Sequence, residues 1–345
     1  MLNSDSPYIS FVVTSRNDNH GEDMLKRMTI FVNGLIHQCN KYKLPCELLF
    51  VEWNPPKENE LLHTVLPKTG ESDYLKIKYV VVPEVIHSQL NNSEKLPLFQ
   101  MIAKNVGIRR AAAEFVVCTN VDLLFADELF ASLVKRELQH KHFYRANRCD
   151  VPNTIDENES VEEQLSFCKK NIIKRLGKSK RFPIFKDQNG IFFKYKIYHP
   201  LLIVLAWVKK MGCSETEKTV ASLDFDACGD FTLMSKKDWI AMQGYAEFEL
   251  YSIHIDSVGL FSAAALNYKQ VVFDGKACTY HIEHKGGWEF ESKIEEINFI
   301  SARPMLDWWT IMEAGKQLVE SKRTINFNKA NWGLNDIQLN EIEQF

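Results

Sequence analysis

The sequence has little of what marks the common non-globular classes of protein. Only 15 of its 345 residues are glycine and 11 are proline, while 45% are apolar, which excludes collagen-like repeats, low-complexity scaffolds and disorder. The longest apolar run, residues 201–208, is far shorter than the roughly 20 residues that cross a bilayer. The formal net charge of −3 gives no chain-wide basic field, so nucleic acid is not an expected partner. We therefore expect a globular protein without a membrane span.

The cysteines also show no sign of an oxidising compartment. All eight are scattered, none forms a Cys-x-x-Cys pair, and the first ten residues have neither the basic nor the apolar segment of a secretory signal. Scattered cysteines of this kind are typical of reducing compartments. We therefore expect a cytoplasmic protein.

Strand-like and helix-like segments alternate along the chain. In the first 150 residues, β-branched runs predict strands and three- to four-residue apolar spacing predicts helices, in the order strand 8–14, helix 25–39, strands 47–53 and 76–82, helix 98–113 and strand 114–118. After residue 228 the prediction is strand 231–234, helix 235–243, strands 270–274 and 277–281, and helix 307–319. This order is typical of an α/β fold with a mostly parallel central sheet flanked by helices.

A basic, aromatic segment interrupts this alternation between residues 151 and 228. Residues 169–210 contain twelve lysines and arginines and a single acid, interleaved with aromatic residues. Two main interpretations stay open: a solvated insertion that packs its rings on the main domain, or a segment that docks on an anionic membrane surface or a lipid-linked acceptor. Nucleic acid is the least favoured partner. Membrane docking would place the protein peripherally at the inner face of a membrane.

Polar residues directly follow several of the predicted strands. Thr14-Ser15-Arg16-Asn17 follows the first strand, Glu52 ends the second, and Asn120-Val121-Asp122 follows the strand at 114–118. Ligands of open α/β sheets bind outside the carboxyl ends of the strands. Glu52 can accept hydrogen bonds from a base or ribose, and a carboxylate such as Asp122 can hold a divalent cation against a diphosphate. The pattern therefore predicts a nucleotide-diphosphate pocket.

These residues resemble the motifs of the GT-A glycosyltransferases, especially the inverting family 2 and its galactosyltransferase-like relatives. That family has a Ser/Thr-Arg-Asn turn after its first strand, an acid ending its second strand, and a helix of the form Ala-Arg-Asn-x-Gly-x-x-x-Ala-x-Gly-Glu, which residues 103–114 (AKNVGIRRAAAE) match. Its Asp-x-Asp metal motif corresponds to Asn120-Val121-Asp122. Weaker similarities follow at 243–247 (QGYAE) and 280–284 (YHIEH). The resemblance covers roughly residues 8–145 and 228–290.

The resemblance implies a GT-A fold with a nucleotide-sugar-binding half (1–150) and an acceptor and catalytic half (229–293). The two segments that it leaves unexplained are predicted, from the sequence alone, as a basic aromatic insertion that contacts the acceptor or a membrane (151–228) and a C-terminal helical extension (294–345). The implied activity is a hexosyltransferase-like transfer, as in polysaccharide biosynthesis, from a UDP- or GDP-sugar to a hydroxyl of a glycan or lipid-linked acceptor. Inversion is favoured, and a retaining course stays open.

The same resemblance implies roles for individual residues. Asp256 is the first choice for the base that takes the acceptor proton, with Glu247 and Asp230 as alternatives. A Mn²⁺ or Mg²⁺ ion would be held by Asp122 with a late histidine, His281 or His284. The residues implied in donor binding are Thr14, Ser15, Arg16, Asn17, Glu52, Lys104, Asn105 and Asn120.

Other interpretations remain open on particular residues. Asn120 replaces the family's first aspartate, and a neutral amide binds a divalent cation more weakly than a carboxylate, so a catalytically degenerate nucleotide-sugar or glycan-binding protein is an alternative. A sugar nucleotidyltransferase uses a similar sheet but normally needs a glycine-rich phosphate loop, which residues 15–18 lack. A literal Asp-x-Asp at 224–226 follows no buried strand, which favours a loop near the acceptor. Glu52 could instead cap a turn, and Asp256 could be a helix N-terminal acid.

Overall fold

The computed structural model describes residues 6–70, 72, 74–177, 214–284, 293–323 and 325–344. Most of the basic aromatic segment, residues 178–210, lies outside the described residues. No helix in the described part of the chain combines the length and the apolar character needed to span a membrane.

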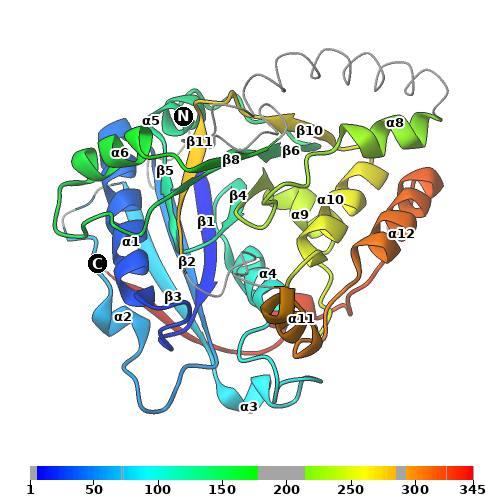
Figure 1. The fold of residues 1–345 in the computed structure, drawn as a ribbon, viewed down its shortest axis with the longest axis horizontal. Coiled ribbons are helices and arrows are strands. Elements are labelled where there is room, and N and C mark those ends of the chain that lie inside the picture. The colour runs from blue at the N-terminus through cyan, green and yellow to red at the C-terminus, as the bar shows by residue number, and fades with distance from the viewer. Residues whose placement is uncertain are drawn as a thin grey trace.

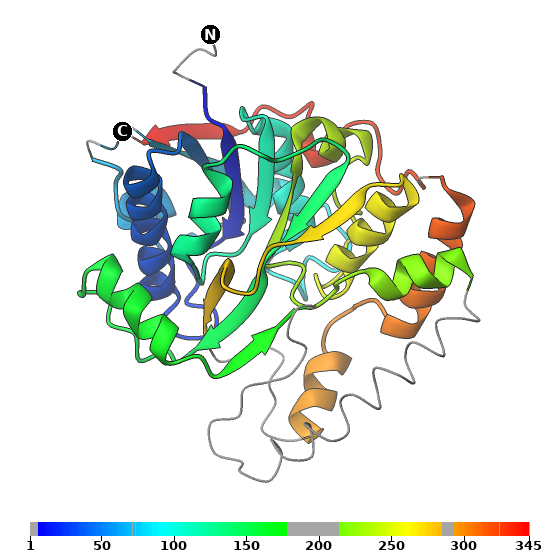
Figure 2. The same cartoon turned by 90° about the horizontal axis from the view of Figure 1, so that it is seen from above.

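A large sheet runs through the centre of the molecule (Figures 1 and 2). Among the described residues it has eight strands in the order β10-β6-β9-β4-β1-β2-β3-β12. The strands are β1 (Ile9–Ser15), β2 (Cys46–Trp53), β3 (Leu75–Val82), β4 (Phe115–Thr119), β6 (His142–Arg145), β9 (Phe231–Ser235), β10 (Lys269–Val272) and β12 (Asn340–Gln344). Strands β1 to β4 pair in parallel, as do β10 and β6, whereas β9 and β12 run antiparallel to their neighbours. The predicted α/β fold with a mostly parallel sheet and flanking helices is confirmed.

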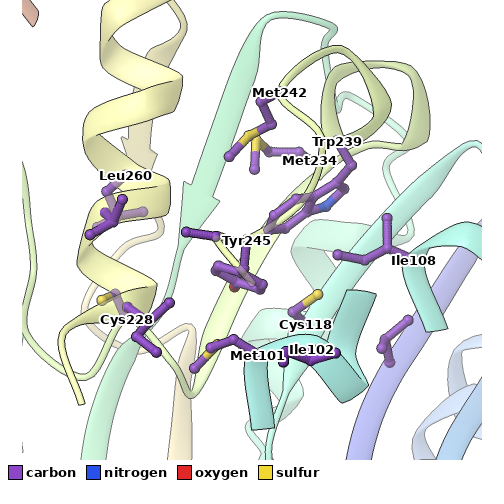
Figure 3. Close-up of a cluster of buried hydrophobic side chains, with 14 of the residues drawn as sticks. Met101, Ile102, Ile108, Cys118, Cys228, Met234, Trp239, Met242, Tyr245 and Leu260 are labelled. Carbon is purple, nitrogen blue, oxygen red and sulfur yellow. The ribbon is translucent and has the colours of Figure 1, made fainter. Parts of the chain in front are cut away.

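Helices cover both faces of this sheet because its buried strands are apolar on both sides. Phe11 and Val13 of β1 pack with α1 (Met24–Tyr42) and α5 (Asp127–Leu133), while Val12 between them packs with the opposite layer. That layer comprises α4 (Gln100–Arg110), α9 (Lys236–Ala241), α10 (Ile255–Ala265) and α12 (Trp308–Ser321). Figure 3 shows its centre, where Trp239 and Tyr245 lie among side chains of α4, β4 and α10.

Asn105 and Gly107 of α4 hold this layer together. Their contacts account for the Asn-x-Gly part of the motif at residues 103–114. A Cβ atom at Gly107 would lie 2.4 Å from Val12 Cγ1, so a glycine is needed where α4 crosses β1. Asn105 donates from Nδ2 to the Tyr245 carbonyl (2.9 Å) and accepts from the Tyr245 N–H (2.8 Å). This clamp holds the turn that follows α9, where Gly244 has φ +70°, a conformation that favours glycine.

A smaller four-stranded sheet brings distant segments to the end of β4. Its strands are β5 (Leu123–Phe125), β11 (Cys278–Ile282), β7 (Asn147–Val151) and β8 (Lys174–Leu176), in that order. Its register pairs His281 with Leu123 on one side and with Asp150 on the other. The Ile282 N–H also donates to the Asp122 carbonyl (3.0 Å). Strand pairing therefore fixes Asp122, Asp150 and His281 beside one another.

The remaining elements lie around this core. They are α2 (Leu62–Val65), α3 (Glu84–His87), α6 (Val161–Lys170), α8 (Glu215–Ser222), α11 (Lys293–Ser301) and a short 3-10 helix, Trp332–Leu334. Residues 294–345, predicted as a helical extension, contain most of α11 and all of α12, but end in β12, which pairs with β3 in the main sheet. Arg110 of α4 holds this tail by donating to the carbonyls of Gly333, Leu334 and Ile337 and to the Glu341 carboxylate.

Candidate functional site

A cavity of about 1280 Å³ lies where β1 and β4 end. Nine of the predicted site residues line it: Thr14, Ser15, Arg16, Asn120, Asp122, Asp230, Asp256, His281 and His284. Five others do not: Asn17, Glu52, Lys104, Asn105 and Glu247. The structure therefore brings predicted site residues from Thr14 to His284 around one space, at the sheet edge where the sequence places a ligand.

Asp122, His281 and His284 form a compact group at one end of this cavity. Oδ2 of Asp122 lies 3.6 Å from His281 Nε2 and 3.2 Å from His284 Nε2. His281 is the fourth residue of β11, whereas His284 follows the strand, so the two rings converge although they are three residues apart. One potential ligand atom from each residue fits within 4.8 Å of the other two, which suits a single metal ion.

The donor atoms of this group fit a divalent cation. Oδ1 of Asp122 is buried and accepts no hydrogen bond from any residue that the structure describes, so one ligand atom remains available. Burial opposes ionisation of Asp122, but the charges and hydrogen bonds of His281 and His284 hold its pKa well below the usual range. Burial likewise opposes protonation of His281, but the Asp122 charge raises its pKa to about 9. A cation bound here would take the place of the His281 proton, because only the neutral imidazole ligates a metal.

Asp150 and Arg148, two neighbours on one face of β7, support this group. Asp150 Oδ1 lies 3.1 Å from His281 Nδ1, and an imidazole held by a carboxylate through Nδ1 presents Nε2 to a metal. Arg148 donates from Nε to Asp150 (2.5 Å) and from Nη1 to Asp230 Oδ2 (3.2 Å). Burial opposes the charge of Arg148, but Asp230 and Asp150 raise its pKa above the usual range. Arg148 therefore stays charged between two aspartates.

Asn120 is held by its neighbours in a way that suits an amide. Its Oδ1 accepts from Gln100 Nε2 (2.8 Å) and from Lys104 Nζ (2.9 Å), while its Nδ2 donates to Asp230 Oδ1 (2.8 Å). Lys104 is fully buried, donates also to the Gly229 carbonyl (2.8 Å), and has its pKa lowered by burial. A second aspartate at position 120 would face Asp230 across that 2.8 Å contact. The amide therefore satisfies both an ammonium donor and a carboxylate acceptor.

The three candidate bases differ in how their carboxylates are occupied. Both oxygens of Asp230 accept hydrogen bonds, from Asn120 and from Arg148. Glu247 lies outside the cavity lining, where it accepts from Asn105 and from the Gly333 N–H, and burial raises its pKa. Asp256, in the first turn of α10, accepts through Oδ1 from the Ser257 N–H (2.8 Å), and its other described hydrogen-bond partner is the Cys228 thiol, a weak donor. Asp256 thus has the carboxylate oxygen most available to a substrate hydroxyl.

Several residues implied in donor binding have structural partners. Both oxygens of Glu52 accept from the Leu62 N–H at the start of α2 (3.1 and 3.0 Å), and burial raises its pKa to about 7. Asn17 donates to the Glu60 carbonyl (2.9 Å), outside the cavity lining. Arg16 lines the cavity but pairs with Asp18 (3.2 Å) and donates to the Pro97 carbonyl (3.1 Å). A nucleotide contact from Glu52 or Asn17 stays a prediction.

Sequence reasoning missed Arg148 and Asp150. The sequence did carry a weak signal for them. Residues two apart lie on the same face of an extended strand, so the opposite charges of Arg148 and Asp150 would be neighbours there. The segment from 147 to 151 was not predicted as a strand, so its charges had no assigned place. The second Asp-x-Asp also differs from a metal site in the structure: Asp224 accepts from the Asp226 N–H (3.2 Å), and neither residue belongs to the metal-binding group.

Comparison with known proteins gives likeness of structure only. No protein-family profile matches the sequence, and a comparison with curated proteins gives no match. The structure is similar to that of S. aureus TarS 1–349, with a TM-score of 0.44 and 12% identity, over 94% of this chain and 73% of that one. It is also similar to the catalytic domain of Drosophila β1,4-galactosyltransferase 7 in its complex with xylobiose, with a TM-score of 0.37 and 9% identity, over 90% of this chain and 79% of that one.

Proposed function

We propose that the protein transfers a sugar from a nucleoside-diphosphate sugar to a hydroxyl of a glycan or glycolipid. The observation that carries this proposal is one cavity at the sheet edge that holds both the Asp122, His281 and His284 group and the Asp256 carboxylate. These are the two things that such a transfer needs, a site for a cation beside the leaving diphosphate and a base for the attacking hydroxyl. The motif resemblance given above supports the same activity.

The ligand set favours Mn²⁺ over Mg²⁺. Mg²⁺ prefers oxygen ligands in octahedral geometry, whereas imidazole suits transition metals, and this group offers two imidazoles and one carboxylate. A divalent cation bound there would neutralise charge on the diphosphate as it leaves. Asp122, His281 and His284 would hold it, with Asp150 orienting His281.

Asp256 performs the proton transfer in this proposal. Its carboxylate takes the proton of the acceptor hydroxyl as that oxygen forms its bond to the anomeric carbon. The bond from that carbon to the diphosphate oxygen breaks, and the diphosphate leaves with the electron pair. Attack from the side opposite the diphosphate inverts the anomeric centre.

A thermal-shift screen tests this function directly. The protein is heated with UDP-, GDP-, dTDP- and CMP-sugars, each with and without Mn²⁺. A ligand at about 100 times its dissociation constant stabilises the fold by roughly 2.7 kcal/mol, which raises the Tm measurably. We expect one nucleotide class to raise the Tm only when Mn²⁺ is present. The absence of any shift would contradict the proposal and favour the catalytically degenerate binding protein.

A cytoplasmic location and membrane contact through residues 169–210 stay predictions from the sequence. A nucleotidyltransferase remains the less favoured enzyme class, since residues 15–18 supply no glycine-rich phosphate loop.

A further inference from the structure

The end of the cavity formed by the helices has aromatic walls. Tyr251, Phe299 and Trp308 line it, from the segment before α10, from α11 and from the start of α12. The Tyr251 and Phe299 rings meet edge to face with centroids 5.6 Å apart, and the Tyr251 N–H donates to the Pro304 carbonyl (2.7 Å). These contacts fix three rings from sequence-distant elements around one end of the cavity.

The guanidinium of Arg303 lies over two of these rings. Its Cζ lies 4.0 Å from the Phe299 ring centroid and 5.5 Å from that of Tyr251, and Nη1 donates to the Phe299 carbonyl (3.4 Å). No carboxylate pairs with Arg303 among the residues that the structure describes. Of the other cavity arginines, Arg16 and Arg148 pair with aspartates, whereas Arg27 donates to backbone carbonyls and is fully buried. Arg303 is thus a half-buried, oriented cation that lines the cavity, and no acid among the described residues balances its charge.

This aromatic end adjoins the candidate base. The Trp308 ring lies 5.0 Å from the ring of His254, and Asp256 follows two residues later in the first turn of α10. A Cβ atom at Gly229 would lie 3.0 Å from Asp256 Oδ2, so the glycine leaves that oxygen room. A ring placed against Trp308 would therefore lie on the Asp256 side of the cavity, whereas a diphosphate belongs at the Asp122 end.

We propose that this end is the acceptor subsite and that it takes a sugar bearing an anionic group, a carboxylate or a phosphate. Aromatic faces pack against the C–H face of a sugar ring. A planar guanidinium donates two parallel hydrogen bonds to a carboxylate or phosphate, and contact with the two rings orients it for this. This proposal rests on the transferase function proposed above and narrows its acceptor to acidic glycans.

Binding measurements on matched acidic and neutral sugars test the proposal without the need for an activity assay. By calorimetry or ligand-observed NMR, galacturonate is compared with neutral galactose, and glucose 6-phosphate with glucose. The first pair supplies the carboxylate and the second the phosphate, so the two sources of charge are distinguished. The protein is the full chain, and the variants are Arg303→Gln and Arg323→Gln. Arg323 is exposed and outside the cavity lining, which makes its variant the matched control.

We expect at least one acidic sugar to bind about tenfold or more tightly than its neutral match. Arg303→Gln should remove that preference and Arg323→Gln should keep it. Trp308→Leu should weaken the binding of acidic and neutral sugars alike. Equal binding of acidic and neutral sugars, no binding of any acidic sugar, or a preference that survives in Arg303→Gln would each overturn the proposal. Nucleotide and Mn²⁺ binding is measured in the same samples, so loss of the transferase function itself would be seen separately.

Discussion

The two ends of the cavity are built in different ways. At the metal-binding end, Asp122, Asp150 and His281 are placed by strand register, and the charges around them are paired with one another. At the aromatic end, Tyr251, Phe299 and Arg303 come from helix ends and connections, and Arg303 has no acid among its described partners. Strand pairing holds side chains in a precise geometry, which the ligands of a metal ion require. Helix ends and connections vary more in sequence and conformation, which suits the recognition of an acceptor.

The sharpest test of the metal-binding end is Asp122→Asn. Removing the carboxylate leaves two imidazoles, and we expect Mn²⁺ affinity to fall by about 100-fold or more, with turnover lost in parallel. Mn²⁺ titration followed by electron paramagnetic resonance measures the affinity. Asp226→Asn is the control, because Asp226 lines the same cavity outside the metal-binding group. Unchanged Mn²⁺ affinity in Asp122→Asn would remove the metal assignment.

Asp256→Asn tests whether the carboxylate that adjoins the aromatic end is the base for the acceptor hydroxyl. An amide cannot take the hydroxyl proton, so turnover should fall by about 10² or more while nucleotide and Mn²⁺ affinity stay unchanged. Steady-state kinetics measures the turnover, and titrations with the nucleotide donor and with Mn²⁺ measure the two affinities. Turnover at the wild-type rate would move the base to Asp230 or Glu247, and a loss of donor binding would place Asp256 at the donor instead.

Asp150→Asn tests whether the buried network supports the metal-binding group. The amide lacks the charge that orients His281, and changes of this kind weaken metal binding by about 10- to 100-fold. The Tm without metal, compared with that of the wild type, shows how much of the effect is loss of folding. A Mn²⁺ dissociation constant equal to that of the wild type would limit Asp150 to a structural role with Arg148.

The smallest expected effect concerns Glu52, outside both ends. Burial raises the pKa of Glu52 from 4.5 to about 7, so the folded state holds this proton more tightly than the unfolded state. The resulting stabilisation is complete below about pH 4.5 and is lost as the pH rises through about 7. Glu52→Gln, which keeps an acceptor for the Leu62 N–H, should therefore gain a few degrees of Tm on the wild type between pH 5 and pH 8. The exposed Glu58→Gln should show no such trend, and parallel Tm curves for wild type and Glu52→Gln would contradict the assignment.

The sequence predicted the main sheet well because its strands are apolar on both faces. Strands β1, β2, β3, β4 and β9 and helices α1, α4 and α12 lie within a few residues of their predicted positions. The short strands β5, β7 and β8 were not predicted, since three to five residues with mixed polarity carry little periodicity. β12 was missed for a related reason: its residues, Asn340–Gln344, are mostly polar and become a strand only by pairing with β3.

Part of the candidate site could be predicted and part could not. Asp122, Asp230, Asp256, His281 and His284 line one cavity, and their roles stay predictions. Asp122, Asp230 and the two histidines lie in or beside strands that the apolar pattern revealed, which is why the sequence could single them out. The local motif could not show that Asn105 would clamp the turn at Tyr245 or that Glu52 would hold α2. Arg303 carried no signal at all, since its stacking depends on packing between α11 and the segment before α10.

The pairing of β12 with β3 also bears on how the protein behaves in concentrated solution. An uncovered sheet edge presents unpaired N–H and C=O groups, and a strand from another molecule can form hydrogen bonds with them. Here the tail occupies that position, with Asn340 opposite Val81 and Gln344 opposite Ile77, and Glu341 is tied to Arg110. Deleting residues 340–344 would uncover the apolar strand β3, and self-association into larger particles, rather than loss of the distant cavity, would be its first sign.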